Sequence, residues 1–318
     1  MIAQKFDQAR VRSFHHHNLK LCARLTNQRA DIRARLRRVT RADLIAQERG
    51  DDRFLLITTV IELLKPEFGF DLYVNSDFPL SSGLGGSTAL VSAIIGCFNE
   101  FRRDPLDNYE IAELAFQAER VTLNMSGGWQ DQYATVFGGL NYLEFTSDDN
   151  VVHPLRLADE TRLELESNLL LCFSNQQHDS AAMTVAAAGQ ASMEFIDEIG
   201  DLTQRMKSLL LKGRLNEFGR LLGRTWSLKR GLADSVSNPR LDAIYAAAIS
   251  AGALGGRLLG AGGGGHFLFF VNPPHRQQVE SRLTELSVVT TPFELETRGL
   301  QSWRVKLYPE APTDVDIN

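Results

Sequence analysis

Apolar and polar residues follow two different periods along the chain, and the periods alternate from segment to segment. Apolar residues recur every three or four positions over 54–64 and 109–121, which predicts amphipathic helices. They alternate with polar residues over 69–75, which predicts a strand, and they form short unbroken runs at 169–173 and 266–271, which predicts buried strands. By the same reasoning, helices are predicted at 54–64, 87–101, 109–121, 193–229 with a break near 213, from 237 onward and at 274–286. Further strands are predicted at 139–145, 151–157, 292–296 and 303–308. Helices and short strands interleave without an internal repeat, so the sequence predicts an α+β or α/β fold.

Length and composition describe an ordinary globular protein. The chain has 318 residues, of which 43% are hydrophobic and 23% charged, so two domains or one large domain are expected. No apolar run approaches the ~20 residues that span a bilayer, so no membrane partner is expected. The three cysteines, Cys22, Cys97 and Cys172, form no C-x-x-C pair, which is typical of a reducing compartment. We therefore expect a soluble cytoplasmic protein.

Charge is distributed unevenly, although the net value is only −5. Residues 1–50 carry 12 Lys and Arg against 4 Asp and Glu, an excess that is also found in nucleic-acid-binding arms. No interleaved aromatic residues offer bases a stacking surface, so a nucleic-acid partner is not predicted. A basic surface near an anionic small ligand, or a solvated surface, is the favoured interpretation.

The first chemical motif is a glycine-rich segment that runs directly into the helix predicted at 87–101. Glycines allow successive backbone N–H groups to converge on phosphate oxygens, and a helix N-terminus adds unpaired donors and a partial positive charge. Ser87 or Thr88 would cap the helix or turn a hydroxyl toward a phosphate-bound metal. A glycine-rich turn with a capping serine is the alternative. The segment predicted to bind nucleotide phosphates includes Pro79, Ser82, Gly83, Leu84, Gly85, Gly86, Ser87 and Thr88.

The second motif is an acidic residue set between amides and next to paired glycines. Asp131 follows Gly127, Gly128 and Gln130, and Glu119 stands twelve positions upstream near the end of a predicted helix. One carboxylate could hold a metal while the other orients or deprotonates a hydroxyl. The alternative is an aspartate that only stabilises a turn.

The third motif is the segment 260–265, in which five of six residues are glycine. Such a segment is favoured where the backbone passes close to a ligand or to another backbone segment, and a flexible hinge is the alternative. Gly262 and Gly263 are its candidate substrate-binding residues.

Taken together, these motifs resemble those of the GHMP kinase superfamily. The phosphate loop is similar to the superfamily pattern P-x-x-x-G-L-G-S-S-A, with Gly86 in place of the first serine and Thr88 in place of the alanine. The segments 127–134, 137–139, 237–239 and 252–256, together with Trp303-Arg304-Val305, resemble the heptose 7-phosphate kinase branch. The resemblance covers roughly residues 50–308.

The resemblance implies an α+β kinase of two domains with the active site between them. A ribosomal-S5-like N-terminal domain would span residues 1–164, and a ferredoxin-like C-terminal domain would span 165–318. ATP would place its phosphates on 83–87, Ser87 and Glu119 would ligate Mg²⁺, and Asp131 would activate the acceptor. The acceptor would be the anomeric hydroxyl of a heptose 7-phosphate, and the product would feed nucleotide-activated heptose for a surface polysaccharide. A homodimer is left open as the assembly.

Some positions depart from the family pattern. Nothing in residues 1–50 resembles the family's opening R-I-S-F-x-G-G-G-T-D motif, so we expect that motif to be missing and sugar affinity to be reduced. Trp129 stands where the branch pattern suggests a polar residue. Arg230 or Arg257, or the basic N-terminal region, would meet the phosphate of the sugar.

Two alternatives to a heptose 7-phosphate kinase remain open at this stage. One is a different GHMP-type small-molecule kinase or a catalytically impaired member of the family. The other is a nucleotide-binding dehydrogenase or a non-enzymatic nucleotide-binding module. A dehydrogenase needs an acidic ribose-binding residue about 20 positions after its glycine loop, for which Glu100 and Asp104 are the candidates.

Overall fold

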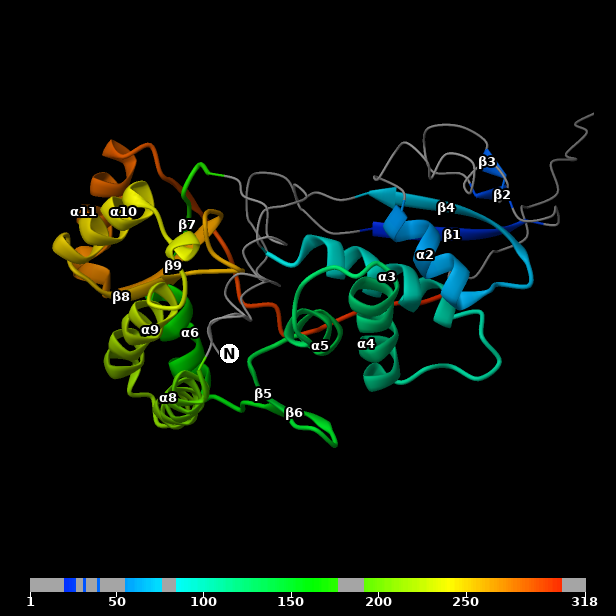
Figure 1. Cartoon of the computed structure of the whole chain (residues 1–318), viewed down its shortest axis with the longest axis horizontal. Coiled ribbons are helices and arrows are strands. Elements are labelled where there is room, and N and C mark those ends of the chain that lie inside the picture. The colour runs from blue at the N-terminus through cyan, green and yellow to red at the C-terminus, as the bar shows by residue number, and fades with distance from the viewer. Residues whose placement is uncertain are drawn as a thin grey trace, which may run out of the picture.

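The computed structural model describes residues 20–26, 31–32, 39–40, 55–75, 84–176 and 192–304, and these form two lobes (Figure 1). In the first lobe, β1 (Lys20–Thr26) pairs antiparallel with β4 (Gly69–Asn75), and the short strands β2 (Asp31–Ile32) and β3 (Val39–Thr40) pair with each other. The helices of this lobe are α2 (Leu55–Leu64), α3 (Gly86–Asn99), α4 (Asn108–Phe116) and α5 (Gln130–Phe137). Their apolar faces share one core with β4, which includes Val60, Phe70, Ile94, Ala115 and Tyr133.

The second lobe is a four-stranded antiparallel sheet covered by helices on both faces. Its strand order is β10 (Val289–Thr291), β7 (Leu169–Phe173), β9 (His266–Val271), β8 (Ala253–Leu258). Side chains alternate across the sheet, so Leu169 and Leu171 pack toward α8 (Met193–Leu211) and α9 (Leu215–Arg230). Leu170 and Cys172 pack toward α10 (Pro239–Ser250) and α11 (Pro273–Glu285). The short helix α6 (Asp159–Asn168) leads into β7.

Local sequence signals account for several element boundaries. Helix α4 begins with a capping box, in which Asp107 accepts from the amide of Glu110 at 2.9 Å and the Glu110 carboxylate accepts from the amide of Asp107 at 2.8 Å. Asn238 caps α10 by accepting from the amides of Arg240 and Leu241, with Pro239 at the first helical position. The predicted break near 213 is confirmed, since α8 ends at Leu211 and α9 begins at Leu215.

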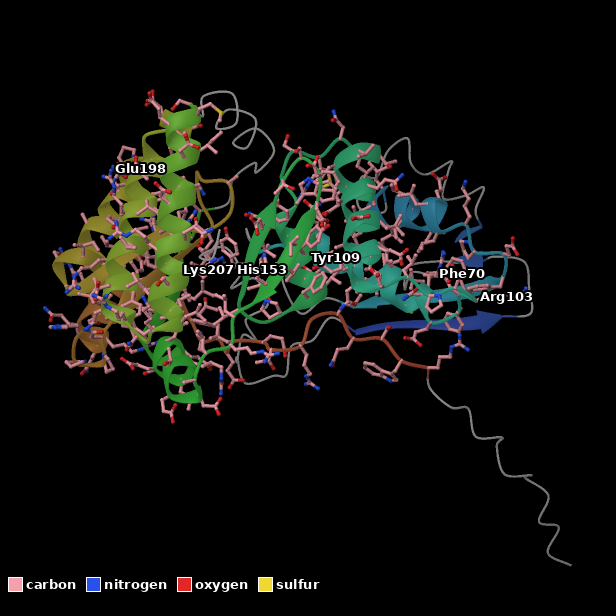
Figure 2. All side chains as sticks on the ribbon, turned by 90° about the horizontal axis from the view of Figure 1, so that it is seen from below. Phe70, Arg103, Tyr109, His153, Glu198 and Lys207 are labelled. Carbon is pink, nitrogen blue, oxygen red and sulfur yellow. The ribbon has the colours of Figure 1, made fainter. Side chains whose placement is uncertain are left out.

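The two lobes meet at the hairpin formed by β5 (Asn141–Phe145) and β6 (Asn150–Pro154). The Nε2 of Gln204 on α8 donates to the hydroxyl of Tyr142 at 2.6 Å, and the Nζ of Lys207 lies 3.8 Å from the centre of the Tyr142 ring. Lys207 and His153 mark this junction in Figure 2. Helix α8 is therefore held against the hairpin by contacts to a single tyrosine.

The chain also returns from the second lobe to the first near its C-terminal end. The amide of Gly139 donates to the carbonyl of Glu296 at 2.9 Å, the amide of Leu300 donates to Val136 at 3.0 Å, and Leu300 packs on the first core. The strand predicted at 292–296 is wrong, because this segment forms no ladder with a described strand, and the carbonyl of Glu296 accepts from Gly139 just after α5. The strand predicted at 303–308 lies largely outside the described residues. The division at 164 and 165 stays a prediction.

Candidate active site

A buried carboxylate joins three helical segments of the first lobe. The two carboxylate oxygens of Glu119 accept hydrogen bonds from Thr88 Oγ1 at 3.0 and 2.8 Å, and one of them also accepts from Gln132 Nε2 at 2.5 Å. Thr88 lies in the first turn of α3 and Gln132 in the first turn of α5. Glu119 is fully buried, and within the described ranges no cation is paired with it. Hydroxyl and amide donors thus hold the Glu119 carboxylate in place without a cationic partner among the described residues.

Glu119 is carried by a π-helical turn. Helix α4 passes directly into a π-helix at Gln117–Thr122, labelled η3 among the elements. The amide of Leu123 reaches back to the carbonyl of Ala118 at 3.2 Å, and that of Met125 reaches the carbonyl of Glu119 at 2.9 Å. A π-turn inserts one residue into the helical register and so changes the direction of the side chains that follow. This places Glu119 and Arg120 toward α3 and α5.

Asp131 is the second carboxylate of the site. It lies in the first turn of α5, where the helix dipole favours negative charge, and its Oδ2 is 3.8 Å from Nη2 of Arg120. Burial raises the pKa of the Asp131 carboxyl above its ordinary value, the Arg120 charge opposes that rise, the Glu119 charge adds to it, and a hydrogen bond with Gln130 lowers the pKa. A carboxylate with a raised pKa is a better proton acceptor near neutrality.

Arg120 lies between Asp131, the candidate proton acceptor, and the paired glycines Gly127 and Gly128. Its guanidinium occupies the space beside Gly127, where a Cβ atom would stand 2.6 Å from Cζ of the arginine, and the backbone φ of Gly127 is +154°. Only glycine permits this approach. The side chain of Arg120 is 10% exposed, and its Nε has no partner in the described part of the chain.

The end of the phosphate loop lies at the start of α3. Gly85 occupies the N-cap position with φ of 72°, and no side chain caps the helix. Of the two roles considered for Ser87 or Thr88, capping of α3 is not found, because Thr88 donates to Glu119 and Ser87 makes no side-chain hydrogen bond with described residues. Pro79, Ser82 and Gly83 lie outside the described residues. The first-turn amides of Gly86 and Ser87 therefore remain without a side-chain cap, as an anion site requires.

The glycine segment 260–265 forms the connection between β8 and β9. A Cβ on Gly262 would stand 3.0 Å from the Cα of Val236, and the amide of Gly263 donates to the carbonyl of Val236 at 2.9 Å. Backbone approach thus accounts for these glycines in the structure, and no described contact joins them to Asp131. Leu84 and Leu259 belong to the same apolar cluster, so the end of the phosphate loop and the residue before the glycine segment contribute to one core.

Several sequence-based alternatives can now be compared with the geometry. Glu100 is the C-cap of α3 and Asp104 lies in the connection to α4, so no second strand presents either residue as a dinucleotide site requires. Arg230 is paired with Asp242 at 3.0 Å, so its charge is already neutralised and it is not retained as a contact of the sugar phosphate. Gln132 and Arg120 belong to the site but were not predicted, although both adjoin predicted residues in the sequence.

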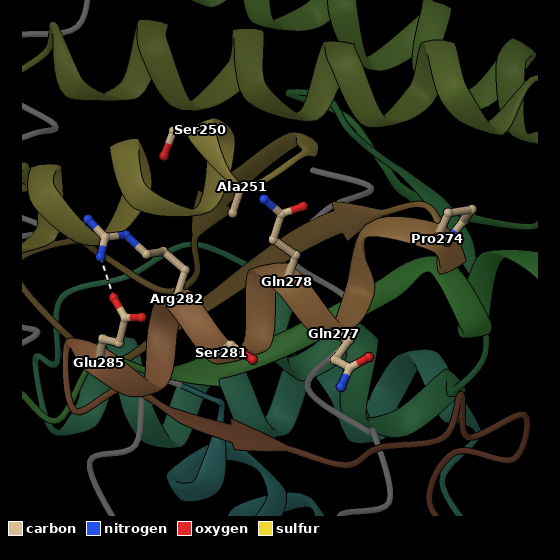
Figure 3. A pocket seen from close by; sticks show the side chains of 8 residues that line it. All are labelled: Ser250, Ala251, Pro274, Gln277, Gln278, Ser281, Arg282 and Glu285. Carbon is tan, nitrogen blue, oxygen red and sulfur yellow. Dashed lines mark hydrogen bonds and ion pairs between the residues drawn. The ribbon is translucent and has the colours of Figure 1, made fainter.

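A surface pocket of about 590 Å³ lies elsewhere, between the end of α10 and the outer face of α11 (Figure 3). Its polar side chains include Gln277, Gln278 and Ser281, and its two charged residues, Arg282 and Glu285, pair with each other. None of the predicted site residues lines it. Within the described ranges no helix is long and apolar enough to cross a membrane, and no cluster of three acidic, histidine or cysteine side chains is present.

Comparison with known families gives matches over both lobes. The model of the GHMP kinases N-terminal domain matches residues 55–139, and that of the GHMP kinases C-terminal region matches 206–288. The D-glycero-alpha-D-manno-heptose 7-phosphate kinase of Campylobacter jejuni is 36% identical over 251 residues, which cover 77% of this chain and 74% of that protein. A mevalonate kinase of Thermococcus onnurineus is 28% identical over 241 residues, which cover 72% and 69%.

Comparison with solved structures gives the same relationship. The crystal structure of a D-glycero-D-manno-heptose 1-phosphate kinase from Bacteroides thetaiotaomicron has a TM-score of 0.70 and 31% identity, and the match covers 92% of this chain and 89% of that one. A phosphomevalonate kinase of Streptococcus pneumoniae also has a TM-score of 0.70, at 13% identity, which is a likeness of fold alone.

Proposed function

The chain belongs to the GHMP kinase family, a family of ATP-dependent phosphotransferases with alcohol acceptors, and we propose that it phosphorylates the anomeric hydroxyl of a heptose 7-phosphate. The proposal rests on the arrangement of two carboxylates. Glu119 is buried and accepts hydrogen bonds from neighbouring side chains, and Asp131 at the start of α5 has a raised pKa. The 36% identity to the Campylobacter jejuni heptose 7-phosphate kinase supports the choice of acceptor.

Phosphoryl transfer requires positioning and charge neutralisation more than covalent chemistry. The uncapped first turn of α3 supplies backbone N–H groups to nucleotide phosphates, and the glycine loop before it allows close approach. Asp131 accepts the proton of the acceptor hydroxyl as its oxygen attacks the γ-phosphorus, and the bond from that phosphorus to the oxygen of ADP breaks. Arg120 keeps the Asp131 carboxylate oriented during this step.

The side chains at the start of α3 fit a magnesium ion. Mg²⁺ prefers oxygen ligands and commonly binds through one or two carboxylates together with substrate phosphates. Glu119 offers a buried carboxylate without a cationic partner in the described residues, and the half-buried Ser87 hydroxyl makes no hydrogen bond there. Ser87 and Glu119 would hold the ion, although the neighbouring Thr88 is the residue that contacts Glu119 in the structure, and the ion supplies neutralisation of phosphate charge when bound. Thr88 and Gln132 would orient the carboxylate.

A panel of acceptors tests the proposal. Purified protein is incubated with Mg-ATP and one of four acceptors, namely D-glycero-D-manno-heptose 7-phosphate, L-fucose, galactose or mevalonate, and ADP release is followed. We expect the heptose 7-phosphate to have the highest kcat/KM of the four acceptors, but a value below the about 10⁴ M⁻¹s⁻¹ of an ordinary enzyme, because residues 1–50 lack the family's opening sugar-binding motif. A higher kcat/KM with mevalonate or an unphosphorylated sugar would assign the chain to another branch of the family.

A further inference from the structure

Two cationic side chains meet between α9 and β8, where the glycine segment leaves the sheet. Lys229 lies in the last turn of α9, and Arg257 is the residue before the end of β8. Thr225 stands one helical turn before Lys229, on the same face of α9, and its Oγ1 is 3.5 Å from Nη1 of Arg257. Lys229 Nζ donates to the carbonyl of Gly260, three residues beyond Arg257. Both cations therefore lie at one place in the second lobe, the junction of α9, β8 and the glycine segment (the cationic joint).

Neither cation has an acidic partner in the part of the chain that the structure describes. Arg257 is only 6% exposed, and its Nε has no hydrogen-bond partner. The hydrogen bond from Lys229 ends on a neutral carbonyl group. Buried charges in proteins are almost always paired or bound to a ligand, because removing an ion from water without compensation is costly.

The other basic side chains on α9 show that this lack of pairing is selective. Arg224 donates to Glu198 at 2.7 Å, and Arg230 is paired with Asp242 at 3.0 Å. These arginines are exposed at the surface, where an ion pair contributes little. The fold thus pairs exposed charges that water would solvate, and it leaves the buried Arg257 and the partly buried Lys229 without an acidic partner among the described residues.

The glycine segment that follows Arg257 in the chain contains unused backbone donors. Gly262 and Gly264 are buried residues of the glycine segment, and their amides donate to no described group, whereas those of Gly263 and Gly265 bond to Val236 and Gln176. Successive N–H groups in glycine-rich turns form anion-binding concavities. Two cations, and two free amides within seven residues of Arg257 along the chain, are the elements of a site for a multiply charged oxyanion.

We infer that Lys229 and Arg257 bind the phosphate monoester that the sugar acceptor already carries. The assignment of that ligand rests on the proposed function, in which the acceptor is a sugar phosphate. A guanidinium and an ammonium form charge-assisted hydrogen bonds to phosphate oxygens and would distinguish a phosphorylated sugar from a neutral one. Leu259, two residues after Arg257, belongs to the same apolar cluster as Leu84, which lies in the segment where the nucleotide phosphates are proposed to bind.

The electrostatics of Lys229 and Arg257 agree with this role. Burial and the neighbouring Arg257 charge hold the pKa of Lys229 well below its ordinary value, and burial lowers the pKa of Arg257 to about 10. An incoming dianion favours the charged form of each group and raises both pKa values. Binding of the phosphate is therefore accompanied by proton uptake wherever Lys229 is partly neutral.

The test compares Lys229→Met and Arg257→Met with Arg230→Met, which removes a neighbouring charge that is already paired. With D-glycero-D-manno-heptose 7-phosphate as acceptor, each of the first two variants should raise the sugar KM by about 10- to 150-fold, the effect of a lost charged hydrogen bond. The KM for ATP should stay constant, and Arg230→Met should change neither value. Lys229→Arg, which keeps the charge, should recover much of the affinity, and melting temperatures confirm that each variant is folded.

A binding measurement that needs no turnover accompanies the kinetics. Calorimetric titration with inorganic phosphate, with the nucleotide site filled by ADP, should give binding to the parent protein and to Arg230→Met but not to Lys229→Met. If the parent turns over no sugar phosphate while this pattern holds, the proposed acceptor is wrong and the anion site stands. Equal phosphate binding in all three proteins, or a raised KM for ATP in place of the sugar KM, overturns the inference.

Discussion

Asp131 and Glu119 are two carboxylates twelve positions apart, and the fold gives them different surroundings. Glu119 is fully buried and accepts three hydrogen-bond contacts from Thr88 and Gln132. Asp131 is partly exposed beside Arg120, and burial raises its pKa. Environments that separate two carboxylates in this way commonly divide their roles, which supports the proposal that Glu119 holds a cation and Asp131 accepts a proton.

Replacing Asp131 by Asn tests the proton-accepting role. The change keeps the shape and removes the charge, so kcat should fall by about 10²- to 10⁴-fold, the range of a lost general base, while ATP affinity stays constant. The removed charge is one that burial disfavours, so the variant should melt no lower than the parent at neutral pH. Turnover at the parent rate would mean that Asp131 only stabilises the start of α5 and does not accept the proton.

The same raised pKa predicts a pH dependence of stability. An acid whose folded-state pKa lies above its unfolded value binds its proton more tightly when folded, so its contribution to stability is present below the unfolded pKa, near 3.8, and is lost as pH rises through the folded value. The urea midpoint of the parent, compared with that of Asp131→Asn, should therefore decline as pH rises above 3.8. A difference that stays constant over this window would contradict the raised pKa.

Removing either proposed magnesium ligand should weaken the use of Mg-ATP. Glu119→Gln and Ser87→Ala should each raise the magnesium concentration that half-saturates the reaction, by about 10- to 100-fold as found for perturbed metal sites. Circular dichroism shows whether the substitution of the buried Glu119 preserves the fold. An unchanged magnesium dependence in both variants would refute the pair.

At the scale of elements, the loop between the π-turn and α5 has a steric requirement that can be tested separately from activity. Gly127→Ala places a Cβ 2.6 Å from the Arg120 guanidinium at a φ of +154°, whereas a Cβ on Gly128 meets nothing within 4 Å. Gly127→Ala should therefore lower the free energy of unfolding by about 1 to 3 kcal/mol. Gly128→Ala should change it much less, and chemical denaturation of both variants measures the difference.

Element positions were predictable from the sequence to the extent that they depend on local patterns. The break between α8 and α9, the start of α10 at Asn238 and the buried strands β7 and β9 follow from periodicity and capping residues, and they were confirmed. The strand predicted at 292–296 is wrong, because a local pattern does not determine which segment a chain bonds to, and here Glu296 bonds to Gly139 beyond the end of α5.

The site was predictable only in part, for a related reason. A helix turns by about 100° per residue, so an uncertainty of one position decides whether Ser87 or Thr88 faces Glu119, and the structure brings Thr88 to it. The π-turn that directs Glu119 and Arg120 has no sequence signal of its own. Lys229 and Arg257 are 28 positions apart, and only the packing of α9 on β8 brings them together.

At the scale of the whole molecule, two long-range connections fix the lobes relative to each other. Tyr142 of the hairpin is held by Gln204 and Lys207 of α8, and residues 296–300 return to the end of α5 and to the first core. These connections hold the carboxylates of the first lobe and the cations Lys229 and Arg257 of the second lobe in fixed positions relative to each other. A kinase that binds its two substrates from different lobes requires such a framework for positioning.

The account is tested most directly by identifying the reaction product. The protein is incubated with Mg-ATP and D-glycero-D-manno-heptose 7-phosphate, and the products are followed by ³¹P nuclear magnetic resonance. We predict that ADP appears together with one new phosphate signal coupled to the anomeric proton, while the signal of the 7-phosphate persists, and that Asp131→Asn forms this product at a much lower rate. ATP consumption without a sugar bisphosphate, or a new phosphate at another hydroxyl, would contradict the account.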